Sequence, residues 1–232
     1  MIEIMKYDKN PLTYLGSCAA ECYGQNKPKR YKSIAEKCIL SEHGRVTEFP
    51  TITMKISEHS AKAIRDLYTH IIGTTRLGSS TRYIDYSKCF NAYVPPKISD
   101  NEEALEKWKK HQDQTYEVMQ ELKEMGVPLE DYTALLPLAY EHTIVLKINL
   151  RALVHMFHIR SCTLAYHECR VIMNEIEEAI YKLEDEEWDW CCKNLFVPKC
   201  VHMLYCTEGN RSCGMRPTKE YVKELLNKNK ED

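Results

Sequence analysis

Two short runs in this chain alternate apolar and polar residues, and they constrain the fold more than any other feature. The first, residues 51–56, places Ile52, Met54 and Ile56 between polar positions, and residues 143–148 repeat the same pattern. A period of two puts one face of a β-strand in a core and leaves the other face outside. The two predicted strands are far apart in the chain, and the sequence between them has mainly helical periodicity.

Helical periodicity dominates the remaining sequence. It predicts helices over residues 31–39, 61–71, 102–125, 149–160 and 164–183. Few strands among many helices predict an α+β fold.

Local signals suggest where these helices begin and end. Asn149 is a favoured N-cap, and Ser99 with Glu102 resembles a capping box. Gly44 is predicted to end the first helix. The run 73–81 is rich in Gly, Ser and Thr and predicts a loop, while 93–96 ends in two prolines and predicts an extended segment.

Composition narrows the class of protein. The chain has 232 residues, of which 44% are hydrophobic and 28% charged, which is typical of globular proteins. Its net charge of −2 gives no electrostatic reason to expect nucleic acid as a partner. No apolar run has the length of a membrane helix, and the N-terminus lacks a signal-peptide core, so we expect a cytoplasmic protein without a membrane partner. The predicted organisation is one domain over residues 1–187 and a Cys-rich tail over 188–232.

The eleven cysteines fall into two groups. We interpret the scattered ones as small core residues in a reduced, cytosolic chain: Cys18, Cys22, Cys38, Cys89, Cys162 and Cys169. In the tail, Cys200, Cys206 and Cys213 could supply three thiolates to a structural zinc ion, which favours four ligands. Candidates for the fourth ligand are Cys191, Cys192 and His202. Reduced thiols without metal, or thiols with redox behaviour, are the alternatives.

One polar segment offers chemistry suited to an anion. Ser79, Ser80, Thr81 and Arg82 combine hydroxyl groups, backbone N–H groups and a guanidinium, which together suit a phosphate. The same composition is also common in ordinary loops.

A second segment places cations on an apolar helix. Arg151 and His155 lie one turn apart and share a face, and Arg160 falls near the helix end. Arginine on an apolar face suggests a planar or anionic partner. A solvated face with a hydrogen-bonded histidine is the alternative. Taken together, the two segments suggest a site for a nucleotide-like molecule.

From about Ser17 to Glu177 the sequence resembles a flavin-dependent thymidylate synthase, with its motifs in the family's order. The matching segments are Ala19-Ala20-x-Cys22-Tyr23, His43-x4-Glu48, Ser80-x-Arg82-Tyr83, Tyr93-Val94-Pro95-Pro96, Leu135-Leu136-Pro137-Leu138, Asn149-x-Arg151 and Arg160-x4-Ala165-x2-Glu168-x-Arg170.

The resemblance implies a fold and a reaction. The fold would place helices on a small, mostly antiparallel sheet. The reaction would be the reductive methylation of dUMP at C5 to dTMP, with FAD as cofactor and with NADPH and methylenetetrahydrofolate as co-substrates. The family's usual state implies a homotetramer with sites between subunits.

The resemblance also implies roles for individual residues. Arg160 would be catalytic, lying against the pyrimidine edge and stabilising negative charge that develops on the ring. The remaining substrate-binding residues would be Ser79, Ser80, Arg82 and Arg151. The flavin-binding residues would be His43, His70, Asn149 and His155.

The chain departs from the family pattern at several positions. The family's Arg-His-Arg stretch appears here as Thr69-His70-Ile71, and a glutamine one turn earlier is Asp66. These departures leave two alternatives open. One is a variant enzyme acting on another pyrimidine nucleotide, and the other is a non-catalytic relative that binds a nucleotide or partner and has a metal-held Cys tail.

Overall fold

The computed structural model describes residues 1–24 and 27–228 and divides the chain into two compact units. Unit 1 contains Met1, residues 55–69 and residues 76–146. Unit 2 contains residues 2–54, residues 70–75 and the chain from residue 147 onward. Each unit is therefore assembled from separated stretches of sequence. Residues 229–232 of the predicted tail lie outside the described part.

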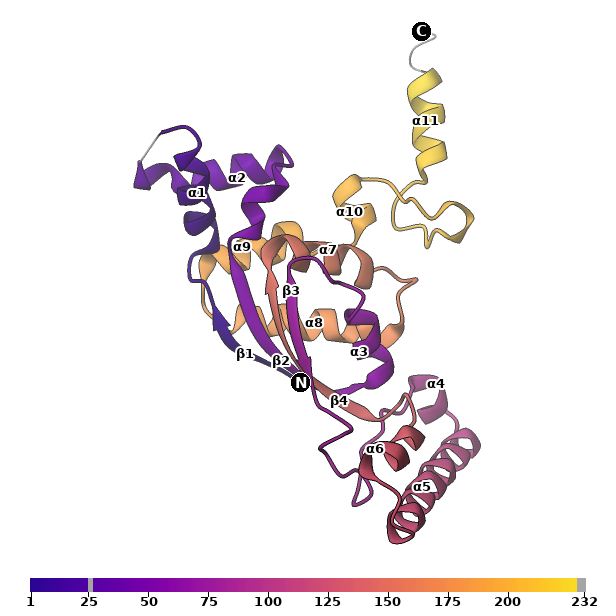
Figure 1. Ribbon diagram of the computed structural model, residues 1–232. Helices are drawn as coiled ribbons and strands as arrows, with labels where there is room; N and C mark the ends of the chain where they lie inside the picture. The colour runs from indigo at the N-terminus through magenta and orange to yellow at the C-terminus, as the bar shows by residue number, and fades with distance from the viewer. Residues whose placement is uncertain (25–26, 229–232) are drawn as a thin grey trace. The chain divides into compact units, whose positions relative to one another are not determined.

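Four strands form one sheet in the order β1-β2-β4-β3 (Figure 1). Their bounds are β1 (Ile2–Tyr7), β2 (Thr51–Ser60), β3 (Thr74–Gly78) and β4 (Glu141–Asn149). Backbone hydrogen bonds show that neighbours run antiparallel, since Ser79 N–H donates to Thr143 O at one end of the β3–β4 pair and Asn149 N–H donates to Gly73 O at the other. The predicted α+β class and the small antiparallel sheet are confirmed.

The two strands predicted from alternation are present, and their apolar faces are buried. Ile52, Met54 and Ile56 on β2 are at most 1% exposed, and on β4 the alternating Ile144, Leu146 and Ile148 are at most 2% exposed. Strands β1 and β3 were not predicted, and placing residues 74–78 in a loop was wrong. Both lie at the edges of the sheet and have no buried residue. Apolar alternation in β1 is limited to Ile2 and Ile4, and β3 has one large apolar residue, Leu77.

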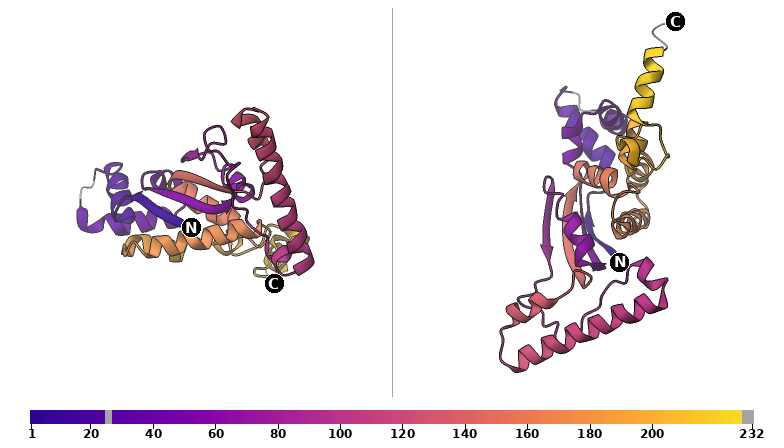
Figure 2. Two further views of the ribbon diagram at one scale, coloured as in Figure 1. Left: turned by 90° about the horizontal axis from the view of Figure 1, so that it is seen from below. Right: turned by 90° about the vertical axis from the view of Figure 1, so that its right-hand side faces the viewer.

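Unit 2 holds most of the helices. They are α1 (Pro11–Glu21), α2 (Tyr31–Leu40), α7 (Leu150–Arg160), α8 (His167–Tyr181), α9 (Glu186–Leu195), α10 (Lys199–Met203) and α11 (Lys219–Lys228). Helices α1 and α2 lie side by side, and α8 packs against β1 (Figures 1 and 2). The apolar stripe of α8 explains that packing, because Ile172, Ile176 and Ile180 are fully buried.

The start of the chain is tied to α9 by an acidic cap. Thr13 donates its N–H and its hydroxyl to the Glu187 carboxylate at 2.7 and 2.6 Å. Asn10 N–H donates to Asp185 at 2.8 Å, and the fully buried Trp188 donates its indole N–H to Asp8 O at 2.9 Å. Buried carboxylates are stable only when they accept such hydrogen bonds. The acidic stretch before α9 is therefore part of the unit 2 core.

Unit 1 contains α3 (Ala61–Leu67), α4 (Pro96–Ser99), α5 (Glu102–Glu124) and α6 (Leu129–Tyr132). Helix α5 has 23 residues and packs against α4 and α6, as the right-hand view of Figure 2 shows. Its N-cap is Asn101, whose side chain accepts the Ala104 N–H at 2.9 Å, so the capping box predicted at Ser99 was wrong.

Other predicted helix ends also shift. Helix α3 stops at Leu67, and Ile71, predicted to be on its apolar stripe, is 69% exposed. Helix α2 ends with Ser41 as C-cap, whereas Gly44 begins a short 3₁₀ helix (Gly44–Glu48). Pro96 opens α4 because proline fits the first turn of a helix, so the extended segment ends at Pro95.

Predictions of burial were only partly right. Of the predicted inner face of α5, Met119 is fully buried but Met125 is 74% exposed. All eleven cysteines are free. Among the scattered ones, Cys38 and Cys169 are buried as predicted, whereas Cys22 and Cys89 are exposed.

A polar network in unit 1 centres on Asp85, and we expect its removal to destabilise the protein. One oxygen of the Asp85 carboxylate accepts from Ser87 and from the Tyr132 hydroxyl, and the other accepts from Lys123 at 2.7 Å. The hydrogen bond from Lys123, followed by that from Ser87, holds the pKa of Asp85 well below its ordinary range.

Asp85→Ala should therefore lower the free energy of unfolding by about 2 kcal/mol at pH 7, measured by urea denaturation. A lowered carboxyl pKa stabilises the fold above the unfolded pKa of about 4 and loses that effect below it, so the deficit should shrink in acid. Asp113→Ala, at an exposed position in the middle of α5, is the control and should change stability by less than about 0.5 kcal/mol. An equal loss in both variants would contradict the role given to Asp85.

Candidate functional site

Asn149 lies where β4 passes into α7, and its side chain begins the helix as predicted. Its Oδ1 accepts the Ala152 N–H at 2.9 Å. The Gly73 backbone packs directly against the Asn149 amide, because a Cβ added to Gly73 would lie 2.7 Å from that side chain. Gly73 also has a φ of +75°, which favours glycine. The predicted flavin ligand Asn149 is thus fixed in place by the helix and by Gly73.

Three predicted site residues come together in unit 2. Arg160 Nε donates to His70 Nε2 at 3.2 Å, and the rings of His70 and His155 meet edge to face with centroids 5.5 Å apart. A guanidinium can only donate, so the buried His70 must accept at Nε2 and carry its proton on Nδ1. His70 lies 90 positions before Arg160 in the sequence, and its hydrogen bond orients the Arg160 guanidinium.

Arg151 and His43 lie at a second position in unit 2. Arg151 forms an ion pair with Glu48 at 2.6 Å, with 57% and 41% of the two side chains exposed. A Cβ added to Gly44 would be 3.2 Å from the Arg151 guanidinium, so the chain after His43 passes close beneath it. The predicted substrate ligand Arg151 is therefore held at the turn that begins with His43.

A cavity of about 420 Å³ lies beside these residues. Its polar lining includes His43, Arg151, His155, His158 and His202, and its apolar lining includes Ile39, Val154 and Leu195. Cations and imidazoles beside aliphatic walls suit a planar molecule that carries negative charge.

His158 is the most perturbed histidine of this cavity. Burial, followed by the nearby His202, His155 and Lys199, lowers the pKa of His158 to about 4. Its Nε2 is buried and has no hydrogen-bond partner among the described residues. The His158 and His202 rings lie 4.8 Å apart. The ring is therefore neutral at pH 7, although His158 itself lines the cavity.

This low pKa predicts a loss of stability in mild acid. Between the unfolded pKa of 6.5 and the folded value of about 4, the unfolded chain binds a proton that the folded protein excludes. Stability should therefore fall as the pH drops through this window, by about 1 to 2 kcal/mol from His158 after allowance for solvent screening. Urea unfolding at pH 7.5 and pH 5.0 measures the effect.

His158→Phe should show a smaller acid loss than the wild type, whereas His111→Asn, changed on the exposed side of α5, should keep the full loss. Identical acid losses in all three proteins would show that His158 does not titrate as its burial requires.

The predicted phosphate-binding residues lie in one turn of unit 1. Ser79 Oγ shares a hydrogen bond with His142 Nδ1 at 3.1 Å, and Ser80 Oγ accepts the Arg82 N–H at 3.2 Å. Arg82 Nε pairs with Glu130 at 3.0 Å, with 68% and 56% of these side chains exposed. An exposed pair contributes little, about 0 to 1 kcal/mol, so an anion can compete with Glu130 for Arg82.

Sequence reasoning missed two polar neighbours of this turn. The Tyr140 hydroxyl lies 2.8 Å from His142 Nδ1, the same atom that Ser79 contacts. Burial raises the pKa of Tyr140 to about 12 and lowers the pKa of His142. The signal that was available is their spacing of two just before the predicted strand 143–148, because an extended chain would place both side chains on one face.

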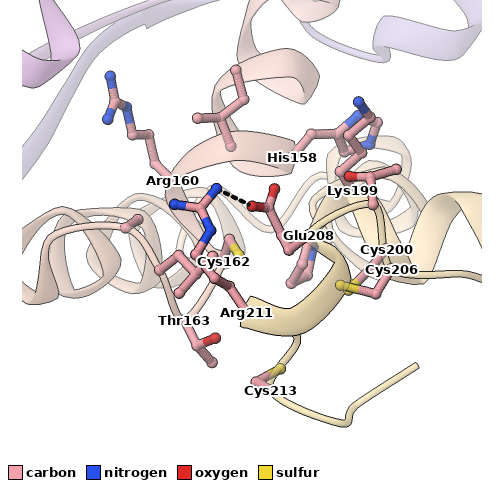
Figure 3. A pocket seen from close by; sticks show the side chains of 15 residues that line it. His158, Arg160, Cys162, Thr163, Lys199, Cys200, Cys206, Glu208, Arg211 and Cys213 are labelled. Carbon is pink, nitrogen blue, oxygen red and sulfur yellow. Dashed lines mark hydrogen bonds and ion pairs between the residues drawn. The ribbon is translucent and has the colours of Figure 1, made fainter. Parts of the chain in front are cut away.

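The cysteines of the tail line a separate pocket of about 330 Å³ in unit 2 (Figure 3). Cys200, Cys206 and Cys213 share it with Cys162, which sequence reasoning had assigned to the core. Figure 3 also shows Arg160 at its rim and the ion pair between Arg211 and Glu208, at 3.1 Å.

The arrangement of these thiols does not identify a zinc site. In residues 1–24 and 27–228, no group of three or more His, Cys, Asp or Glu side chains is placed to hold a metal ion. Burial, followed by Cys206, Cys162 and Cys213, raises the pKa of Cys200. Of the proposed fourth ligands, Cys191 and Cys192 are buried in α9, and His202 lines the other cavity.

None of the helices in the described part of the chain combines the length and apolar character that crossing a membrane requires.

Comparisons with known proteins agree with the fold and with the order of the motifs. The family model described as thymidylate synthase complementing protein matches residues 3–183. A flavin-dependent thymidylate synthase of Thermococcus onnurineus (strain NA1) is 28% identical over 243 residues, covering 97% of this chain and 96% of the relative. One of Pyrococcus furiosus is 28% identical over 221 residues, covering 89% of each.

Solved structures share the fold at lower identity. The flavin-dependent thymidylate synthase of Helicobacter pylori, complexed with FAD and dUMP, has a TM-score of 0.61 at 17% identity and covers 82% of this chain and 98% of its own. A UMP/dUMP methylase of Streptomyces cacaoi, bound with 5-Br dUMP, has a TM-score of 0.64 at 16% identity and covers 79% and 90%. Because the family model spans most of the chain, the protein belongs to the thymidylate synthase complementing protein family, the enzyme family of flavin-dependent thymidylate synthases.

Proposed function

We propose that this enzyme methylates dUMP at C5 to give dTMP, with methylenetetrahydrofolate as one-carbon donor and NADPH as reductant. The observation that carries the proposal is the contact of Arg160 with His70, beside the ring of His155. It retains a guanidinium in a fixed orientation although the chain lacks the two arginines that flank this histidine in the family pattern. The family membership and the two dUMP-related solved neighbours support the same reaction.

Arg160 acts on the pyrimidine by electrostatics. A guanidinium fixed at the ring edge stabilises negative charge as it develops, and this effect is strong because the donor does not have to reorganise. Neutral His70 maintains that orientation without adding a second positive charge. The nucleotide phosphate would be bound by Ser79, Ser80 and Arg82. Arg82 would break its ion pair with Glu130 and pair with the phosphate instead.

We assign the FAD site to the cavity beside α7. His43, Arg151 and His155 provide donors for an anionic, planar group, while Ile39 and Val154 provide apolar walls. When bound, FAD supplies the hydride-transfer chemistry that no side chain can perform. The family's usual homotetramer is part of the proposal, with the complete site formed between subunits.

Absorption spectroscopy and product analysis test this function. The purified protein should show a flavin spectrum after FAD is added, and the spectrum should change again with dUMP. With all co-substrates present, mass spectrometry should detect dTMP. Protein that neither binds FAD nor releases a methylated product would refute the proposal.

A second candidate is an enzyme for another pyrimidine nucleotide. The departures at Thr69 and Ile71 motivate it, and the Streptomyces cacaoi neighbour is named for both UMP and dUMP. Parallel reactions with dUMP, UMP and deoxyuridine separate the candidates. A methylated ribonucleotide formed faster than dTMP would favour the second.

A further inference from the structure

His142 in unit 1 joins two hydroxyl groups through a single ring nitrogen. Ser79 Oγ lies 3.1 Å from His142 Nδ1, and the Tyr140 hydroxyl lies 2.8 Å from the same atom. Ser79 Oγ also accepts the Thr143 N–H at 3.4 Å. The Ser79 hydroxyl is therefore part of a network that begins at the histidine and ends in the turn formed by residues 79–82, here called the anion turn.

The ring of His142 is held closely at the end of β3. A Cβ added to Gly78 would lie 2.6 Å from both His142 Nε2 and the Tyr68 hydroxyl, so only glycine leaves room for the imidazole. The guanidinium of Arg76 lies 4.8 Å from the centre of the Tyr68 ring, and Tyr86 packs against Tyr140. These three tyrosines and Arg76 are titratable or charged groups that the structure places near the histidine, and Glu141 adjoins it in the chain.

The proton on Nδ1 biases the direction of the Ser79 hydroxyl proton, in competition with the Tyr140 hydroxyl. A serine hydroxyl has one proton to donate. When Nδ1 is unprotonated it must accept, and either Ser79 or Tyr140 directs its proton inward. When both ring nitrogens are protonated, Nδ1–H donates, so Ser79 can accept from it and direct its own proton toward a ligand. Protonation thus supplies a donor and a positive charge together.

We propose that His142 is a positioning residue of the anion turn, which makes binding of the nucleotide phosphate depend on proton uptake at the histidine. This inference rests on the proposed function, because it takes the phosphate of a pyrimidine nucleotide as the ligand. His142 acts through Ser79 and has no contact with the reacting ring.

The electrostatics around His142 agree with this coupling. Burial lowers the pKa of His142, so the ring is neutral near pH 7 when no anion is present. A phosphate beside Ser79 favours the charged imidazole and raises that pKa. By linkage, lowering the pH should tighten phosphate binding over the range in which only the complex is protonated.

Isothermal titration calorimetry of the full chain with dUMP tests the inference. Titrations at pH 6.0 and 7.5, in buffers of different ionisation enthalpy, count the protons taken up on binding. The wild type should take up more protons than His142→Asn, in which the amide can still donate to Ser79 but cannot titrate. Relative to that variant, wild-type affinity should gain about 3- to 10-fold between pH 7.5 and 6.0.

Matched variants separate this role from a general loss of structure. The phosphate of dUMP titrates near pH 6, but it does so equally for every variant and cancels in the comparison. His111→Asn, changed on exposed α5, should behave as the wild type. Ser79→Ala should abolish the coupling, and adding His142→Asn to it should cause no further change. Deoxyuridine, which lacks the phosphate, should show no difference in proton uptake between wild type and His142→Asn.

Two failures can be told apart. Tight dUMP binding with equal proton uptake in wild type and His142→Asn would overturn the coupling and leave the proposed function intact. Absence of dUMP binding by the FAD-loaded wild type at either pH would overturn the proposed function itself.

Discussion

Replacing Arg160 with alanine is expected to lower kcat by about 10²- to 10³-fold, the cost of removing one preorganised charge-stabilising donor. In the proposed mechanism Arg160 stabilises charge that develops only in the transition state, so the effect should be larger on kcat than on KM for dUMP. Steady-state assays with saturating co-substrates measure both parameters. Arg160→Lys should recover only part of the rate, since an ammonium cannot reproduce the planar contact with His70.

Arg211→Ala is the matched control for this experiment. Arg211 lines the same pocket as Arg160 and pairs with Glu208 at an exposed position, so its loss should change kcat by less than about twofold. Circular dichroism should show that both variants are folded. If Arg160→Ala retained kcat within about fivefold, the charge-stabilising role would be wrong.

Gly16→Ala is expected to lower the free energy of unfolding by at least about 3 kcal/mol. Alanine at an exposed position inside a helix would ordinarily stabilise it by about 1 kcal/mol over glycine. Here a Cβ on Gly16 would overlap the backbone carbonyl of Tyr31, where α2 begins. Backbone cannot rotate away as a side chain can, so the α1–α2 pair would have to separate. Urea denaturation measures the loss.

Gly126→Ala separates this overlap from ordinary backbone strain. Gly126 has a φ of +84°, and an added Cβ would meet nothing within 4 Å. Its replacement should therefore cost only about 1 to 2 kcal/mol, from the left-handed conformation alone. Equal losses in the two variants would show that α1 and α2 can move apart without penalty.

The two central strands could be predicted because burial of one face requires alternating apolar residues in the sequence. Residues 52, 54 and 56 face a core on β2, and the same pattern marks β4. Edge strands β1 and β3 were missed because neither contains a buried residue and their apolar alternation is brief, limited to Ile2 and Ile4 in β1. The start of helix α7 could be predicted to the residue because asparagine is a favoured N-cap, and Asn149 caps the helix through its side-chain oxygen.

The candidate site was only partly accessible from sequence. Spacing indicated that Arg151 and His155 share a face, but no local pattern brings His70 to Arg160, because that contact depends on how β3 and the segment before it pack. His142 was missed for a related reason: it lies just before the predicted strand 143–148, and its contact with Ser79 crosses from β4 to the end of β3. Contacts between distant segments require the fold.

The ties between the N-terminus and α9 have a consequence for synthesis on the ribosome. Asp8 and Thr13 cannot meet Trp188 and Glu187 until these two later residues have emerged from the ribosome. Until then α9 cannot pack against α1. The apolar side of α1, with Leu12 and Leu15, is therefore exposed to chaperones or to other nascent chains. Slowed translation late in the message should therefore lower the yield of native protein more than an early pause of equal length.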